Sequence, residues 1–364
     1  MNRLRDWRWK GLGFAALLAA TGNCSSSGDA GPAQPSADDP DGGVDAGEPV
    51  VVGTGAACTP QTHEVIGIKM ALEANWSSTP GTVGCEAASG CNGTVSVWLM
   101  SQFDVSGQMV TGTTTTCGNQ TPILTLTQLG SEAAGVQSGA AHLDVEFPSS
   151  VWAAVAMNPM KPPVPSTGVL GGWNLGSSLK IDPTFASFGL APSSPLTTAS
   201  ATWPASESGI PSTDITDDDD DGHPGITATP SSTDGNVLPP TGLSTSPPYA
   251  PLADALYLVL RSEISFYGLA TSCTEFSGTA SAPLFNNHVI GCHLQGGGDC
   301  VQTQWDFVDQ MSTVYVGSGV TIPAGVEPPS FAPSGITGTF TAKVLSNDAD
   351  GGGIDCAAVL AALP

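Results

Sequence analysis

Five consecutive aspartates near the middle of the chain are the side chains best suited to bind a ligand. They occupy positions 217–221 and are followed by a glycine. Alternate carboxylates on a tightly turning backbone converge on one point, and carboxylate oxygens are the ligands that Ca²⁺ prefers. The spacing therefore predicts a calcium site formed by Asp217, Asp219 and Asp221. His223 follows them and is expected to add its backbone carbonyl.

This stretch resembles the D-x-D-x-D-G opening of EF-hand loops, and its lack of flanking helices makes it more similar to the loops of thrombospondin-type or dockerin-type repeats. Ala228 stands where an EF-hand has its bidentate glutamate. Asp214 or Asp234 is available to complete the ligand set. The alternative is a solvated acidic linker, the ordinary role of a run of like charges. Residues 347–351 (NDADG) form a second, weaker relative.

Motifs for catalysis are missing from the sequence. It contains no G-x-S-x-G, no H-E-x-x-H and no glycine-rich phosphate loop before a helix. His288 and His293 are five positions apart in an expected strand, so they face opposite sides and cannot chelate one metal without a bulge. His63 and His142 lie near carboxylates in the sequence, but no spacing assembles a site. We therefore expect a protein that is not an enzyme.

The charge of the chain excludes one class of partner. The formal net charge is −24, and four of the nine basic residues lie within the first ten positions. A surface this acidic repels phosphate backbones, so we expect no nucleic-acid partner. Divalent cations are its natural partners.

The N-terminus predicts export. Residues 1–10 are cationic and residues 11–20 are apolar, which is too short a run to remain as a membrane span. The small residues that lead into Cys24 resemble the lipobox of bacterial lipoproteins, although Thr21 stands where that family prefers leucine. The resemblance implies a signal peptide over 1–23, a lipid on Cys24, and anchoring in a membrane. Ser25 implies the outer membrane, on its periplasmic or its surface face.

Residues 24–55 are rich in Gly, Ala, Asp, Pro and Ser and contain few apolar side chains. Such a composition predicts a disordered acidic tether between the lipid and a folded body. The alternative for the N-terminus is ordinary secretion, which would leave an odd free thiol.

Cysteine counting agrees with an oxidising compartment. Lipidation of Cys24 leaves an even set of eight cysteines, which is expected to form disulfides. The set is Cys58, Cys85, Cys91, Cys117, Cys273, Cys292, Cys300 and Cys356. Loop length favours Cys85–Cys91, and a Cys58–Cys117 pair is plausible. The remaining four cysteines are then expected to pair among themselves.

Patterns of alternating apolar residues predict a mainly β body over 56–364, stabilised by disulfides and containing one or two short helices. Expected strands cover 64–76, 94–103, 109–117, 121–129, 142–147, 168–175, 255–268, 274–284, 287–294 and 338–345, with helices at 301–311 and 356–363. Two strand-rich halves, 56–190 and 253–364, flank a Pro/Ser/Thr/Asp-rich crossover at 191–252, for which we expect no core of its own. The fold class is an antiparallel sandwich or a barrel-like body.

The sequence thus predicts a lipid-anchored protein of the cell envelope with a structural or binding role and a possible structural calcium. Two alternatives remain open. One is a β-barrel that carries a small apolar ligand, which a deep apolar cavity would favour. The other is a secreted hydrolase whose catalytic residues come together only in the fold.

Overall fold

The computed structural model describes residues 48–77, 84–85, 92–120, 124–127, 141–204, 207–231, 253–294, 297–301, 330–331, 336–348 and 351–364. The signal peptide, Cys24 and most of the expected tether lie outside these ranges. So do Cys91, Asp234, Asp350 and all of the expected helix at 301–311 except Val301.

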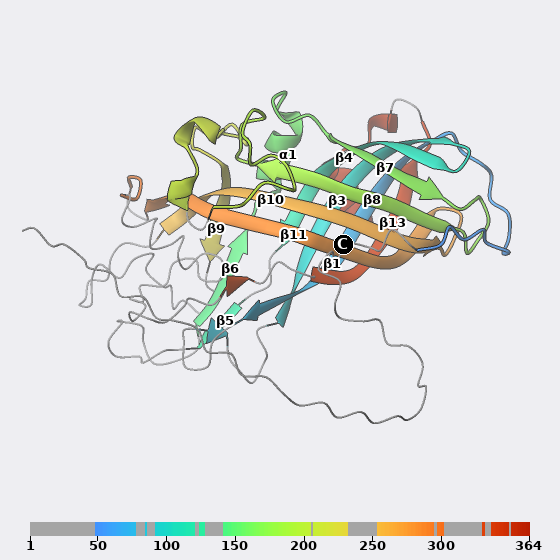
Figure 1. The fold of residues 1–364 in the computed structure, drawn as a ribbon, viewed down its shortest axis with the longest axis horizontal. Coiled ribbons are helices and arrows are strands. Elements are labelled where there is room, and N and C mark those ends of the chain that lie inside the picture. The colour runs from blue at the N-terminus through green and yellow to red at the C-terminus, as the bar shows by residue number, and fades with distance from the viewer. Residues whose placement is uncertain are drawn as a thin grey trace, which may run out of the picture. The chain divides into compact units, whose positions relative to one another are not determined.

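Eight antiparallel strands close into a barrel (Figure 1). They are β1 (His63–Ser77), β3 (Asn92–Ser106), β4 (Met109–Gln120), β7 (Val164–Leu170), β8 (Ser178–Phe188), β10 (Ala253–Ala270), β11 (Glu275–Leu294) and β13 (Ile336–Ser346). Each strand pairs with the next one in this order, and β13 pairs with β1. The two strand-rich halves of the sequence therefore share one barrel, because the pairings β8–β10 and β13–β1 join them. The predicted mainly antiparallel β class is confirmed.

Alternation along the strands fills the barrel interior. On β1, the buried inward side chains are those of Ile66, Ile68, Met70 and Leu72. Ile68 lies opposite Leu99 of β3 and opposite Ala342 of β13, both of which are also buried. Burial of an aliphatic side chain of this size contributes about 1.5–3 kcal/mol, so the alternation on β1 is a large part of what fixes its register.

A small extension continues from the barrel. It contains β2 (Gly84–Cys85), β5 (Leu124–Thr127), β6 (Ala141–Glu146) and β9 (Ile226–Ser231), while β12 (Ser330–Phe331) pairs with the end of β1. β9 pairs with β10 and with β6, and β6 in turn pairs with β5. The extension matters for function because β9 directly follows the acidic stretch and joins it to β10.

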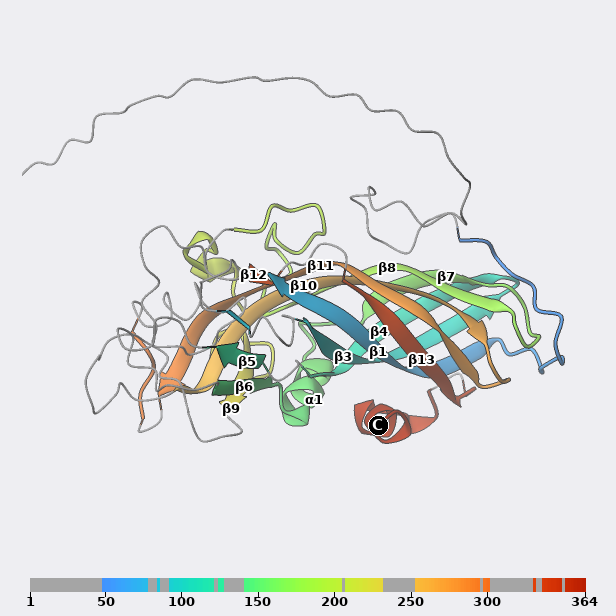
Figure 2. The ribbon, with the colours of Figure 1, turned by 90° about the horizontal axis from the view of Figure 1, so that it is seen from below.

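Two helices pack on the barrel (Figure 2). In α1 (Ser149–Met157), Trp152 packs edge-on against Phe188 of β8, with ring centroids 5.2 Å apart. α3 (Cys356–Ala362) is preceded by Asp355, its N-cap residue. The Asp355 carboxylate accepts a hydrogen bond from the backbone N–H of Ala358 at 2.9 Å. Short 3₁₀ turns occur at Glu207–Gly209, Ser212–Asp214 and Gly351–Gly353. Among the described residues, no helix is long and apolar enough to cross a membrane.

Most sequence-predicted strands are present, and the differences have physical causes. The two strands expected at 274–284 and 287–294 are one continuous strand, β11. Pro283 lies where the register with β10 shifts, a bulge that accommodates a residue without an N–H. The sequence analysis missed β8 and α1, and it placed β7 about four residues too late.

Three disulfides lie among the described residues, and they correct the expected pairing. Cys58 pairs with Cys273 and Cys117 pairs with Cys356, so the proposed Cys58–Cys117 bond is wrong. Cys292–Cys300 is the one described bond within the last four cysteines. Both longer bonds join a cysteine of the first strand-rich half to one of the second, because the two halves share one closed sheet.

The residues after β8 overturn a second expectation. The described residues between 189 and 215 (189–204 and 207–215), here called the outer excursion, fold back onto the outer face of β10. Leu190, Leu196 and Ile210 form a small hydrophobic cluster with Val259 of β10. This part of the crossover therefore does have a core, which the abundant Pro, Ser and Thr of the sequence concealed.

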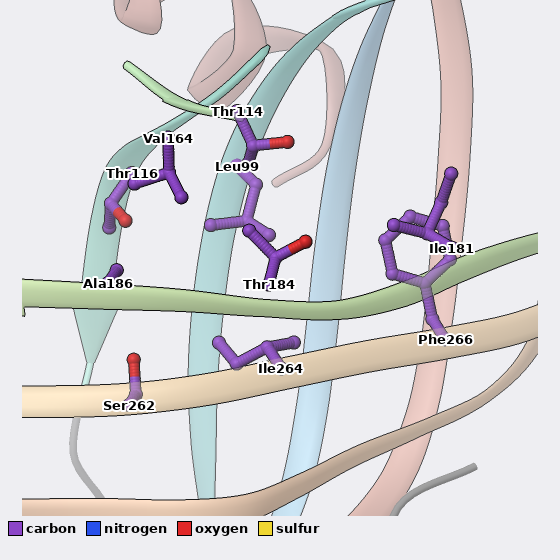
Figure 3. Close-up of a pocket in the computed structure, with 10 residues that line it drawn as sticks. All are labelled: Leu99, Thr114, Thr116, Val164, Ile181, Thr184, Ala186, Ser262, Ile264 and Phe266. Carbon is purple, nitrogen blue, oxygen red and sulfur yellow. The ribbon is translucent and has the colours of Figure 1, made fainter. Parts of the chain in front are cut away.

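A small cavity lies inside the barrel, and its lining side chains come from β3, β4 and the start of β7 on one side and from β8 and β10 on the other (Figure 3). Its volume is about 30 Å³, which suits a water molecule and is far below the roughly 300–1,000 Å³ of a ligand pocket. Hydroxyls of Ser101, Thr114 and Ser166 are linked beside it by hydrogen bonds of 2.8 Å. An eight-stranded barrel is just wide enough for its side chains to fill it.

Glu64 gives the barrel a testable pH dependence. Its side chain is 4 % exposed, and burial raises its pKa from 4.5 to about 7, against the opposing effect of His63. The unfolded chain therefore ionises this carboxyl first, and the free energy of unfolding should fall as pH rises from about 4.5 to about 7, by about 3 kcal/mol. Urea unfolding from pH 4 to 8 should show this fall in the difference between the wild type and Glu64→Gln. Parallel pH profiles for the two proteins would contradict it.

Candidate metal centre

The acidic loop, residues 216–225, connects the outer excursion to β9. Its two ends are held together by backbone hydrogen bonds from Asp218 N–H to Gly225 O (2.9 Å) and from Gly225 N–H to Thr216 O (2.7 Å). Within the loop, Asp220 and Gly222 have positive φ angles of 55° and 89°. Asparagine, aspartate and glycine tolerate this region best, so the sequence suits the tight reversal that brings the alternate carboxylates together.

Asp217, Asp219 and Asp221 each place a carboxylate oxygen within 4.8 Å of the others. Backbone N–H groups orient two of these carboxylates. Asp217 accepts a hydrogen bond from Gly222 N–H at 2.8 Å, and Asp221 accepts one from His223 N–H at 2.8 Å. The convergence expected from the alternate spacing is therefore found, and these are the three groups that the sequence analysis had selected.

Asp219 is the buried member of the cluster. Its side chain is 7 % exposed, and its Oδ2 accepts a hydrogen bond from Thr227 N–H of β9 at 3.0 Å. Its Oδ1 is buried and has no hydrogen-bond partner. Burial raises the pKa of Asp219 to about 6 in spite of the Thr227 hydrogen bond, and the neighbouring charges of Asp221 and Asp217 raise it further. A buried carboxylate oxygen without a partner is costly unless a cation satisfies it.

Asp218 has the opposite orientation and anchors the loop to the body. Its carboxylate is fully buried and lies 3.0 Å from Lys161 Nζ, and it accepts hydrogen bonds from the Thr216 hydroxyl (2.7 Å) and from Gly189 N–H (2.5 Å). Burial raises its pKa, while Lys161 opposes that shift. Asn158, at the end of α1, also donates to Asp218 O at 3.0 Å. The sequence analysis did not predict this contact between Asp218 and Lys161. The only indication in the sequence was that a chain with few basic residues has a lysine at position 161.

His223 does not bring its side chain to the cluster. Its ring stacks on Tyr257 of β10, with centroids 4.4 Å apart and planes 12° apart. The Tyr257 hydroxyl faces Asp299 at 3.4 Å, and burial together with Asp299 raises the pKa of Tyr257. The expected ligation by the His223 backbone carbonyl stays a prediction. The stack fixes the end of the acidic loop on the barrel wall.

Other residues considered for the site lie elsewhere. Asp214 accepts a hydrogen bond from the Ser194 hydroxyl at 2.9 Å and is not part of the cluster. Ala228 is fully buried in β9, so the twelfth position of an EF-hand has no counterpart here. In the weaker relative at 347–351, the described Asp348 faces Ser346, and no described cluster forms there.

The histidines show no shared site, and one expectation about them was wrong. A register shift in β11 places His288 opposite Val259 and His293 opposite Ala255, so both lie on one face of the strand. Their partners nevertheless differ. His288 Nε2 lies 3.0 Å from Pro204 O, and His293 Nδ1 lies 2.6 Å from Asp254.

His63 pairs with Asp104 at 2.9 Å, close to where the chain enters the barrel. Its Nε2 is buried and has no hydrogen-bond partner, so no serine hydroxyl is joined to it. The described residues thus contain histidine–carboxylate pairs, but they do not assemble a nucleophile with either of them.

Comparisons of the chain with protein-family models, with curated proteins and with solved structures found no match. The function proposed below therefore depends on the geometry of the acidic loop and of the barrel around it.

Proposed function

We propose that this chain is an exported, lipid-anchored protein of the bacterial cell envelope, not an enzyme, whose acidic loop holds a structural calcium ion. The observation that carries the calcium assignment is the buried, unpartnered Oδ1 of Asp219, a residue whose carboxylate forms a cluster with those of Asp217 and Asp221. Oxygen donors from alternate positions around a glycine turn suit Ca²⁺. An ion there would tie the outer excursion to β9 and, through the His223–Tyr257 stack, to β10.

Two observations support the anchor. The three described disulfides favour an oxidising compartment outside the cytoplasm. The last residues of the expected tether, which was placed at 24–55, and the segment after them are also attached to the barrel. Val51 N–H donates to the Ser178 hydroxyl at 2.9 Å, Gly53 N–H donates to the Ser177 hydroxyl at 3.0 Å, and the Cys58–Cys273 bond follows. A tether that begins at Cys24 would thus end on a rigid support.

The alternatives receive less support. The interior cavity of about 30 Å³ gives a carrier of apolar ligands no room among the described residues. A hydrolase would need a nucleophile beside one of the two histidine–carboxylate pairs, and none of the described hydrogen bonds provides it.

Calcium should raise the thermal midpoint of unfolding. At a free calcium concentration 100 times Kd, a site that exists only in the folded protein contributes about 2.7 kcal/mol, which corresponds to roughly 4 °C in a body of this size. Calorimetry in calcium and in chelator should show this difference in the wild type and in Asp220→Asn, the matched control, because Asp220 lies outside the cluster. Asp219→Asn should abolish it. Equal midpoints for the wild type under both conditions would reduce the acidic loop to a linker.

The anchor is tested separately at the mature N-terminus. Mass spectrometry should find a chain that begins at a lipid-modified Cys24, and Cys24→Ser should move the protein from the membrane fraction to the soluble fraction. An unmodified chain that begins at another residue would refute lipid anchoring while leaving the calcium site untouched.

A further inference from the structure

The acidic loop provides too few ligands to enclose a calcium ion. Three carboxylates converge, whereas Ca²⁺ takes six to eight oxygen ligands. The bidentate ligand that completes an EF-hand is replaced by Ala228, which is buried in β9. Even if the His223 carbonyl contributes, several coordination positions remain for oxygens that do not belong to the described residues.

The acidic loop has a buried side and an exposed side. Asp218 and Asp219 form the buried side of the acidic loop, where they contact Lys161 and Thr227. Asp221 and Gly222 are exposed on the other side. An ion held between the buried Asp219 and the exposed Asp221 would therefore have protein on one side and solvent on the other.

The local charge decides which kind of oxygen suits these positions. A divalent cation held by three carboxylates leaves a net charge of −1, and the exposed Asp220 beside it adds another negative charge. Carboxylates and phosphates are repelled at this range, because opposing like charges within a few ångströms cost free energy even near a surface. Neutral hydroxyl oxygens avoid this cost, and two vicinal hydroxyls can replace two water molecules at once.

We infer that the acidic loop is a calcium-dependent binding site for a carbohydrate, which it takes by the vicinal hydroxyls of a neutral sugar. This inference rests on the proposed calcium site and assigns that site a ligand. The stack of His223 on Tyr257 fixes the end of the acidic loop that carries this site.

Terbium luminescence separates this inference from the calcium site itself. Tb³⁺ should bind the full exported chain, be displaced by Ca²⁺, and be lost in Asp219→Asn but kept in Asp220→Asn. Failure at this step refutes the calcium site, and the carbohydrate site with it. Lifetimes in H₂O and D₂O then count the coordinated waters. Two or more are expected, whereas none or one would show a closed site and overturn only the inference.

The ligand class is tested on the calcium-loaded protein. Methyl α-D-mannopyranoside at tens of millimolar should shift the amide resonances of Asp221 and Gly222 and should have no effect in chelator. It should also lower the water count on Tb³⁺ by two. Acetate at the same concentration and ionic strength should leave these resonances in place. Shifts with acetate alone, or with neither compound, would overturn the inference although the metal binds.

Discussion

Replacing Cys117 and Cys356 together by alanine is expected to lower the free energy of unfolding by about 5 kcal/mol, measured by urea denaturation. The bond joins β4 to α3 across a sequence separation of 239 residues. In the chain-entropy account, a crosslink stabilises by restricting the unfolded chain, and the effect grows with the logarithm of the loop length. A loop this long lies near the upper end of that range.

The Cys292–Cys300 bond provides the matched control. Its separation is 8 residues, so the same relation gives about 2.5 kcal/mol for the double alanine variant. Cys117, Cys292 and Cys300 are buried and Cys356 is half-buried, so the losses of packing are comparable. If the two double variants lose equal stability, loop length is not what makes the Cys117–Cys356 bond important. Detachment of α3 would then be the better explanation, and hydrogen exchange at Trp98, whose indole N–H donates to Leu363 O at 2.7 Å, would detect it.

The strands that could be predicted are those whose own residues show an apolar pattern. β1 has apolar residues at alternate positions from Ile66 to Leu72, and β10 begins with a run of β-forming apolar residues, so both were predicted. β8 was missed because Pro183 and several partly exposed side chains interrupt its pattern, and its pairing with β10 fixes it as a strand instead. Local pattern predicts a strand well when one face is buried along its whole length.

Closure of the barrel could not be predicted from local sequence patterns. β1 and β13 are separated by more than 250 positions, and their pairing depends on the register of every strand between them. The long-range disulfides also depend on the fold: Cys58 and Cys117 were paired in the prediction because both lie in the first half of the chain, whereas the fold brings Cys58 to Cys273. Cysteines far apart in the sequence become neighbours only after the sheet has curled.

In the candidate site, too, the features that depend on local spacing could be predicted, and those that depend on long-range contacts could not. The convergence of Asp217, Asp219 and Asp221 follows from their spacing alone and could be predicted. The role of Asp218 could not, because its partner Lys161 belongs to the chain segment after α1, 57 positions earlier by residue number. One run of identical residues thus has two roles in the structure, and only contact with the body distinguishes the carboxylate that anchors the loop from those that converge in the cluster.

Arg261 holds the outer excursion on the barrel. Its guanidinium is 2 % exposed and has no carboxylate among its described partners. It donates instead to the carbonyl oxygens of Leu196 (3.3 Å), Thr198 (3.1 Å) and Ala201 (2.7 Å). Burial lowers its pKa, and the ring of Trp203 lies 4.7 Å from it. A planar group with five donors suits three carbonyls of one loop in a way that a single ammonium group does not.

Arg261→Met is therefore expected to lower the free energy of unfolding by about 3 kcal/mol, because it leaves buried carbonyls without donors at a cost of about 1–3 kcal/mol each, partly recovered as the excursion loosens. Arg261→Lys should recover little of the loss. Lys343→Met, which removes a cation from the outer surface of β13, is the control and should have a small effect. Hydrogen exchange should show opening confined to residues 189–215. Uniform loss of protection across the barrel would mean that Arg261 supports the whole sheet, and that the outer excursion is not the separately anchored layer described above.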